Sequence, residues 1–195
     1  GIRDLVRSRG LGDVYKRQAS IDSPAECRRL LDFDIAAADL TGLLPLVERS
    51  VMVKKGVVEQ DPREQGIRRA LNLGHTAGHA FESLAMRRGR PVPHGYAVAW
   101  GLVVDLIISH MKLGFPSAAV HELAAYVGRV YGVMPITCDD YPALLELMSH
   151  DKKNATPGAI NFTLLDAPGK IHIDCIVDAR DIEAALDIFR DLMGI

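Results

Sequence analysis

Three histidines in the middle of the chain have the residue type and spacing to bind a metal ion. His75 and His79 are four residues apart in the segment RRALNLGHTAGHA (residues 68–80), and His94 follows a proline-containing loop. Neutral imidazole is a common zinc ligand, and one helix turn can offer two imidazoles to one ion, or one ligand and a neighbouring acid or base. If the loop folds back, His94 lies beside His75. An i, i+4 histidine pair without the glutamate of the HExxH motif is, however, more often a surface or core feature.

The spacing of polar residues around these histidines favours a helix. A helix over residues 67–87 would place on one face four side chains that recur every three or four residues, namely Asn72, His75, His79 and Glu82. Gly74 and Gly78, four residues apart, would let another backbone pack closely against this helix. Because a glycine inside a helix costs about 1 kcal/mol relative to alanine, two of them indicate a packing or functional reason.

Three basic residues would together suit a phosphate or carboxylate group. Lys54 interrupts the apolar stripe of a predicted helix, Arg68 precedes the histidines, and Lys152 lies in a predicted loop. Each has an ordinary alternative. The stem of Lys54 would cover the core while its ammonium reaches water, and Arg68 and Lys152 would be solvated.

The hydrophobic pattern predicts a mainly α fold, a helical bundle with one β-hairpin. Helices are expected over residues 23–33, 41–60, 67–87, 94–113, 117–131, 141–149 and 181–193. The valines of the second helix recur on one face, at Val47, Val51 and Val58. Strand-like alternation at residues 160–165 and 170–176, around the turn sequence DAPG, predicts the hairpin.

Composition limits the classes of protein to which the chain can belong. The 195 residues are 48% hydrophobic and 25% charged, with a formal net charge of −2, which gives no sign of a nucleic-acid or anionic-membrane partner. The three cysteines form no CxxC pair, so neither a disulfide framework nor a thiolate zinc site is expected. The longest apolar run, residues 97–111, is interrupted by Asp105 and is shorter than the ~20 residues that span a bilayer. We expect a cytoplasmic protein.

The first eighteen residues differ in character from the rest. Residues 1–18 are basic and polar without clear periodicity, and residues 8–18 (SRGLGDVYKRQ) match the translation of a sequencing adapter. We therefore expect residues 19–195 to be native sequence that continued further upstream. The alternative is a natural basic tail.

The order of the conspicuous residues resembles the core signature of the 3-dehydroquinate synthase family. It comprises KKGVVEQDPREQGIRRALNLGHTAGHA (residues 54–80), HGYAV (residues 94–98), the DKK at residues 151–153 before the hairpin, and Gly169 within the hairpin. No single piece is specific, but the combination is. The resemblance implies the C-terminal α-helical, metal- and substrate-binding domain of that fold for residues 19–195.

The resemblance also implies an activity in the shikimate pathway. The family uses NAD and a divalent cation, zinc or cobalt, to convert the sugar phosphate 3-deoxy-arabino-heptulosonate 7-phosphate into 3-dehydroquinate and phosphate. Carried over by position, the metal ligands are His75 and His94, and His79 lies beside them as a polar or proton-relay residue. The residues implied to contact substrate are Lys54, Arg68, Asn72 and Lys152, with Glu64 in a supporting role.

The resemblance carries expectations about the whole protein as well. The family's NAD-binding domain and a third metal ligand, a glutamate, are expected upstream of residue 19, and the full-length protein is expected to form a homodimer. Alone, the chain is expected to be inactive and to bind zinc weakly through two ligands. The alternatives are another sugar-phosphate cyclase such as 2-deoxy-scyllo-inosose synthase, a metal-dependent polyol dehydrogenase, or a non-catalytic helical module.

Overall fold

The computed structural model describes residues 25, 28, 32, 40–149 and 160–195. Three features of the sequence therefore lie outside the described residues: the adapter-like segment, most of the predicted helix at residues 23–33, and the loop that contains Lys152.

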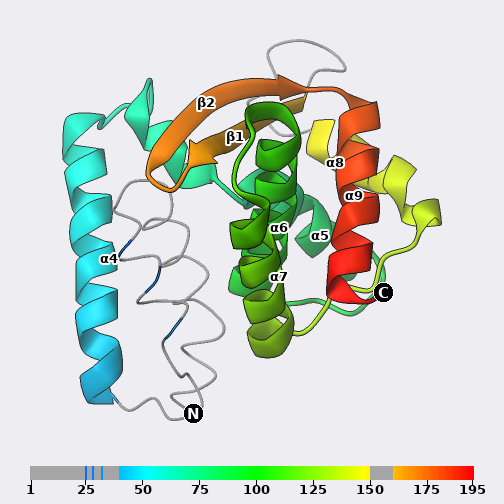
Figure 1. The fold of residues 1–195 in the computed structure, drawn as a ribbon, viewed down its shortest axis with the longest axis horizontal. Helices are drawn as coiled ribbons and strands as arrows, with labels where there is room; N and C mark the ends of the chain where they lie inside the picture. Colours follow the sequence, from blue (N-terminus) through cyan, green and yellow to red (C-terminus); the bar gives the residue numbers. More distant parts are fainter. Residues whose placement is uncertain (1–24, 26–27, 29–31, 33–39, 150–159) are drawn as a thin grey trace.

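The described residues form helices and a two-stranded antiparallel sheet (Figure 1), which confirms the predicted mainly α fold with one hairpin. In chain order the elements are α4 (Leu40–Gln60), the 3-10 helix η2 (Ile67–Asn72), α5 (His75–Arg87), α6 (His94–Leu113), α7 (Ser117–Tyr131), the 3-10 helix η3 (Cys138–Asp140), α8 (Tyr141–Ser149), β1 (Ile160–Ala167), β2 (Lys170–Val177) and α9 (Ala179–Met193).

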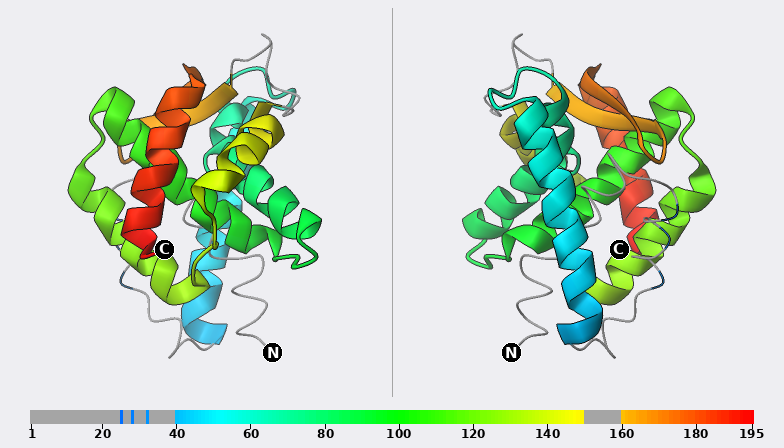
Figure 2. Two further views of the ribbon diagram at one scale, coloured as in Figure 1. Left: turned by 90° about the vertical axis from the view of Figure 1, so that its right-hand side faces the viewer. Right: turned by 90° about the vertical axis from the view of Figure 1, so that its left-hand side faces the viewer.

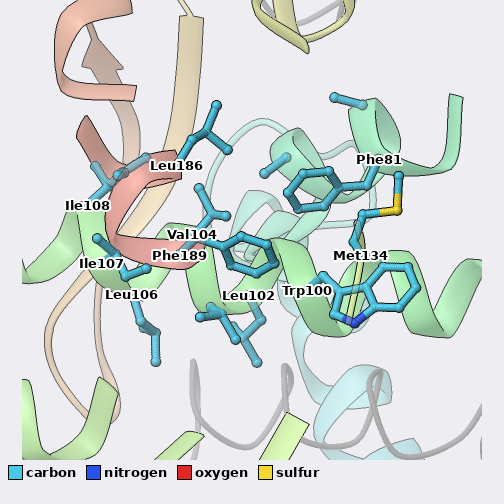
Figure 3. Close-up of a cluster of buried hydrophobic side chains, with 14 of the residues drawn as sticks. Phe81, Trp100, Leu102, Val104, Leu106, Ile107, Ile108, Met134, Leu186 and Phe189 are labelled. Atoms are coloured by element: carbon cyan, nitrogen blue, oxygen red, sulfur yellow. The ribbon is translucent and has the colours of Figure 1, made fainter. Parts of the chain in front are cut away.

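Helix α6 is the centre of the core. It contacts α5, α7, α9 and β1, and an unbroken run of its residues from Ala97 to Ser109 is buried. Phe81 of α5 stacks on Phe189 of α9 beside it, with ring centroids 5.5 Å apart, and Figure 3 shows apolar side chains from these helices gathered around α6. By length and composition α6 could cross a membrane, but 72% of its apolar window is buried inside the protein, and this packing accounts for its composition.

The hairpin lies across one end of the helices, and α4 runs along one side of them (Figures 1 and 2). Strand β1 pairs with β2 from Ile160 opposite Val177 to Ala167 opposite Lys170, with two irregularities in the register. Most of β1 is buried, whereas exposed and partly buried residues alternate along β2. The hairpin therefore covers the core with β1 and presents one face of β2 to solvent.

The prediction of one continuous helix over residues 67–87 is wrong. The segment is a 3-10 helix that ends at Asn72, followed by a turn and then α5, which begins at His75. Gly74 is the break, because its φ of 78° lies in the left-handed region that glycine adopts at no steric cost. Asn72 therefore does not share a helical face with His79 and Glu82.

The valine stripe expected to pack along residues 41–60 is also only partly buried. Val47 and Val51 are 36% and 53% exposed, whereas Val57 is 3% exposed. The buried positions of α4 thus lie on a different side from the stripe that contains Lys54, whose own side chain is exposed.

Candidate metal centre

Three imidazole rings lie together where α5 meets the start of α6. The ring centroids of His75 and His79 are 5.2 Å apart, those of His75 and His94 are 5.4 Å apart, and those of His79 and His94 are 5.7 Å apart. One potential ligand atom from each ring lies within 4.8 Å of the others. The predicted convergence of His75 and His94 is present, and His79 belongs to the same cluster.

Glycines bring the two helices close enough for this convergence. A Cβ at Gly101 of α6 would lie 2.5 Å from the backbone nitrogen of Gly78 and 2.8 Å from its Cα, which is closer than real Cβ atoms approach. A Cβ at Gly78 would lie 3.0 Å from the Cα of Val98. The backbones of α5 and α6 are therefore in direct contact, as the spacing of Gly74 and Gly78 predicts.

A buried carboxylate holds the turn that precedes the first histidine. Asp105 of α6 is fully buried, and its Oδ2 accepts a hydrogen bond of 2.5 Å from the backbone N–H of Gly74. Asp105 is therefore a buried polar residue with a hydrogen-bond partner. One residue beyond His75, the hydroxyl of Thr76 donates to the carbonyl oxygen of Asn161 in β1 at 3.0 Å. The start of α5 is thus attached both to α6 and to the hairpin.

Two of the three rings contact an oxygen atom through Nδ1. Nδ1 of His94 lies 3.0 Å from Oε2 of Glu82, and Nδ1 of His75 lies 3.4 Å from the carbonyl oxygen of Leu73. A metal-binding histidine commonly uses its second ring nitrogen in this way, to donate to a carboxylate or a backbone carbonyl. Nε2 is therefore the nitrogen through which each of these two rings would bind a cation.

The cluster fits a divalent metal ion of the zinc type. A tetrahedral zinc ion with bonds of 2.0–2.1 Å holds its nitrogen ligands about 3.4 Å apart, and small side-chain rotations would bring the three rings to that separation. His79 and His94 are exposed, so the centre is open to solvent and to a small molecule. Among the described residues, these three histidines are the group whose ligand atoms lie close enough together to share a metal ion.

A second set of polar residues surrounds the loop between α4 and η2. The side-chain amide of Asn72 donates to Oε1 of Glu64 at 3.3 Å, and Nε of Arg68 lies 4.0 Å from Oε2 of the same residue. Nη1 of Arg68 also donates to the carbonyl oxygen of Pro62 at 2.9 Å. Glu64 therefore contacts two of the residues predicted to bind substrate, and its supporting role stays a prediction.

Asp61 holds this loop in its fold, a role that was not predicted from the sequence. Its carboxylate accepts hydrogen bonds from the backbone N–H groups of Gln65, Gly66 and Arg68 at 3.0, 2.7 and 3.1 Å. These hydrogen bonds lower the pKa of the Asp61 carboxyl, and the bond from Gln65 has the largest effect. Burial acts in the opposite direction and raises the pKa. The sequence signal for this turn is the Asp61-Pro62 pair directly after the predicted helix, which is typical of a helix end or a turn of the chain.

The remaining predicted residues are not brought into the cluster by contacts that the structure describes. Lys54 is exposed on α4, and Lys152 lies outside the described residues. The other described histidines have separate surroundings. Nδ1 of His110 contacts the carbonyl oxygen of Phe115 at 2.7 Å, His121 is exposed, and Nε2 of His172 lies 3.3 Å from Oδ2 of Asp166.

Solved structures that share this arrangement of helices and hairpin include a 2-deoxy-scyllo-inosose synthase and a 2-epi-5-epi-valiolone synthase. A 2-deoxy-scyllo-inosose synthase complexed with carbaglucose-6-phosphate, NAD+ and Co2+ superposes with a TM-score of 0.71 at 19% identity, over 93% of this chain and 50% of its own. The 2-epi-5-epi-valiolone synthase ValA from Streptomyces hygroscopicus, with NAD+ and Zn2+ bound, gives a TM-score of 0.68 at 19% identity, over 97% of this chain and 52% of its own. The chain therefore has the fold of one half of these synthases.

The sequence matches define the family to which the chain belongs. The chain belongs to the 3-dehydroquinate synthase C-terminal family, whose model matches residues 10–154. A 3-dehydroquinate synthase of Parabacteroides distasonis is 47% identical over 99% of this chain and 54% of its own length, and that of Pyrococcus furiosus is 39% identical over 90% of this chain and 46% of its own. The chain thus spans about half the length of these relatives, and the predicted resemblance is confirmed.

The family match begins at residue 10, which lies inside the adapter-like residues 1–18. The assignment of that segment stays a prediction.

Proposed function

We propose that this chain is the metal- and substrate-binding half of a 3-dehydroquinate synthase, which converts 3-deoxy-arabino-heptulosonate 7-phosphate into 3-dehydroquinate and phosphate. The observation that carries the proposal is the cluster of three imidazoles, with ligand atoms within 4.8 Å of one another, in a chain of this family. The names of its curated relatives favour this substrate over those of other sugar-phosphate cyclases.

His75, His79 and His94 are the residues of this chain that would hold the divalent cation, zinc or cobalt. The solved relatives contain Zn2+ or Co2+ together with NAD+. When bound, such a cation supplies a Lewis acid beside a substrate oxygen, and NAD supplies a hydride acceptor. His79 has a second role open to it, because an exposed imidazole beside the substrate can accept or donate a proton.

Arg68 and Asn72 would orient the substrate beside the cation. They are seven and three residues before His75, so the same short stretch of chain carries the anion-binding groups and a metal ligand. The Arg68 guanidinium suits a phosphate or carboxylate, and Glu64 holds both side chains towards the same loop. Lys54 and Lys152 would complete the cationic surface around the substrate.

A chimera tests this proposal in a complete enzyme. The portion of the Parabacteroides distasonis relative that this chain does not match would be joined to this chain, and phosphate release from the heptulosonate phosphate would be measured with NAD and zinc. We expect turnover that is lost in His75→Ala and retained in His121→Ala, since His121 is exposed on α7. A folded chimera without phosphate release, or activity that survives the His75→Ala substitution, would refute the proposal.

A further inference from the structure

A carboxylate on α5 contacts the ring of the histidine that begins α6. Glu82 lies three residues after His79 on α5, so the two side chains are on one side of that helix. Oε2 of Glu82 lies 3.0 Å from Nδ1 of His94, and the two side chains are 29% and 44% exposed. The contact thus links α5, which carries His75 and His79, to the ring of His94 on α6.

We propose that Glu82 is a positioning residue, which fixes the ring of His94 so that Nε2 faces the cation site. This inference rests on the proposed metal-binding function of the three histidines. An ionised carboxylate only accepts hydrogen bonds, so its partner Nδ1 carries the proton, and the lone pair of the neutral ring is then on Nε2. The same contact sets the rotation of the ring about its bond to Cβ.

The Nδ1 atom of His75, by contrast, contacts a main-chain atom. Nδ1 of His75 lies 3.4 Å from the carbonyl oxygen of Leu73, an atom of the main chain two residues earlier. His94 comes from a different helix, and it is the exposed first residue of α6. Glu82 therefore supplies from a side chain what the backbone supplies for His75.

This role makes a different prediction from that of a simple ion pair between two helices. Removal of a partner that orients a metal-binding histidine typically lowers metal affinity 10–100-fold. We expect that loss in Glu82→Ala, whereas Glu82→Gln keeps an oxygen that can accept from Nδ1–H and should retain most of the affinity. Glu183→Ala removes an equal charge from an exposed position on α9 and should change nothing.

Two measurements on the chain would test the proposal. Long-range ¹H–¹⁵N NMR of the metal-free protein with neutral imidazoles reports the tautomer of His94, which should be protonated at Nδ1 in the wild type and in Glu82→Gln, and should lose this preference in Glu82→Ala. Zinc affinity, measured by competition with a chelator, should fall in the same variant.

The outcomes separate this inference from the function on which it rests. Unchanged tautomer and unchanged zinc affinity in Glu82→Ala would overturn the positioning role. If the wild type binds no zinc, the metal-binding proposal fails, and the tautomer of His94 still decides whether Glu82 fixes the ring. The positioning role would also be contradicted if Glu82→Gln lost as much zinc affinity as Glu82→Ala while the tautomer of His94 stayed unchanged in both variants.

Discussion

Replacement of Gly101 by alanine should destabilise the protein and disturb the histidine cluster. The new Cβ would lie 2.5 Å from the backbone nitrogen of Gly78, 2.8 Å from its Cα, and closer still to the carbonyl oxygen of Gly74. All three are backbone atoms, which cannot rotate away as the end of a flexible side chain can. Helices α5 and α6 would have to separate by about 1 Å to restore ordinary contact, which moves His94 relative to His75.

The magnitude follows from two opposing effects. Forcing an extra carbon into a close-packed interior costs about 1–3 kcal/mol, and the upper end applies at Gly101 because only backbone can yield. Alanine regains about 1 kcal/mol of helix propensity relative to glycine. The net loss in the free energy of unfolding should be about 2 kcal/mol, or a melting temperature lower by roughly 4–8 °C for a chain of this size.

Urea and thermal unfolding of the variant and the wild type would measure this loss. Gly56→Ala is the matched control, because Gly56 lies inside α4 and a Cβ there would have nothing within 4 Å. The control should be as stable as the wild type or more so. If Gly101→Ala proves as stable as Gly56→Ala, then α5 and α6 do not cross as closely as the positioning of the histidines requires.

Three further predictions concern the groups that hold the site in place. Asp105→Ala would leave the buried N–H of Gly74 without its acceptor and should cost about 1–3 kcal/mol in urea unfolding; Asp105→Asn, which keeps an acceptor oxygen, should cost clearly less. The lowered pKa of Asp61 means that its stabilising effect is present above the unfolded value of about 3.9 and is lost as the pH falls through the lower folded value. Asp61→Asn should therefore lose less stability than the wild type between about pH 5 and pH 3, and equal slopes would refute this. Arg69→Met removes an ion pair of 2.6 Å to Asp174, but both side chains are about 40% exposed, so denaturation should show a loss of about 1 kcal/mol or less.

The sequence was sufficient to predict the elements that rest on local patterns. Residues 160–165 and 170–176 alternate around a Pro-Gly turn, and they form the hairpin, with Gly169 at a φ of 81°. The long apolar run predicts α6, since a helix that contacts neighbours on every side is apolar all round. The histidine spacing and the family signature together predicted which rings would meet.

The break in the helix at Gly74 could not be predicted from local pattern. Glycine is compatible with a helix interior, and its left-handed φ here is stabilised by contacts from distant sequence: the carboxylate of Asp105, 31 residues away, and the backbone at Gly101. The contact of Glu82 with His94 was missed for a similar reason. Its position on the histidine face of α5 was predicted, but its partner comes from the next helix, after a loop whose path the sequence does not define.

The exposed valines of α4 show a further limit of periodicity. Val47, Val51 and Val58 have the spacing of a buried face, yet the first two are exposed and Val57 is buried instead. Periodicity identifies an apolar side of a helix but not which neighbour covers it.

Zinc titration of the 195-residue chain and of its His94→Ala variant tests the central claim most directly. If the imidazoles of His75, His79 and His94 form one cation site, the wild type binds about one zinc ion per chain in competition with a chelator. His94→Ala should bind it at least about tenfold more weakly, and His121→Ala should match the wild type. Equal zinc binding by the wild type and His94→Ala would contradict the claim that these rings share a metal.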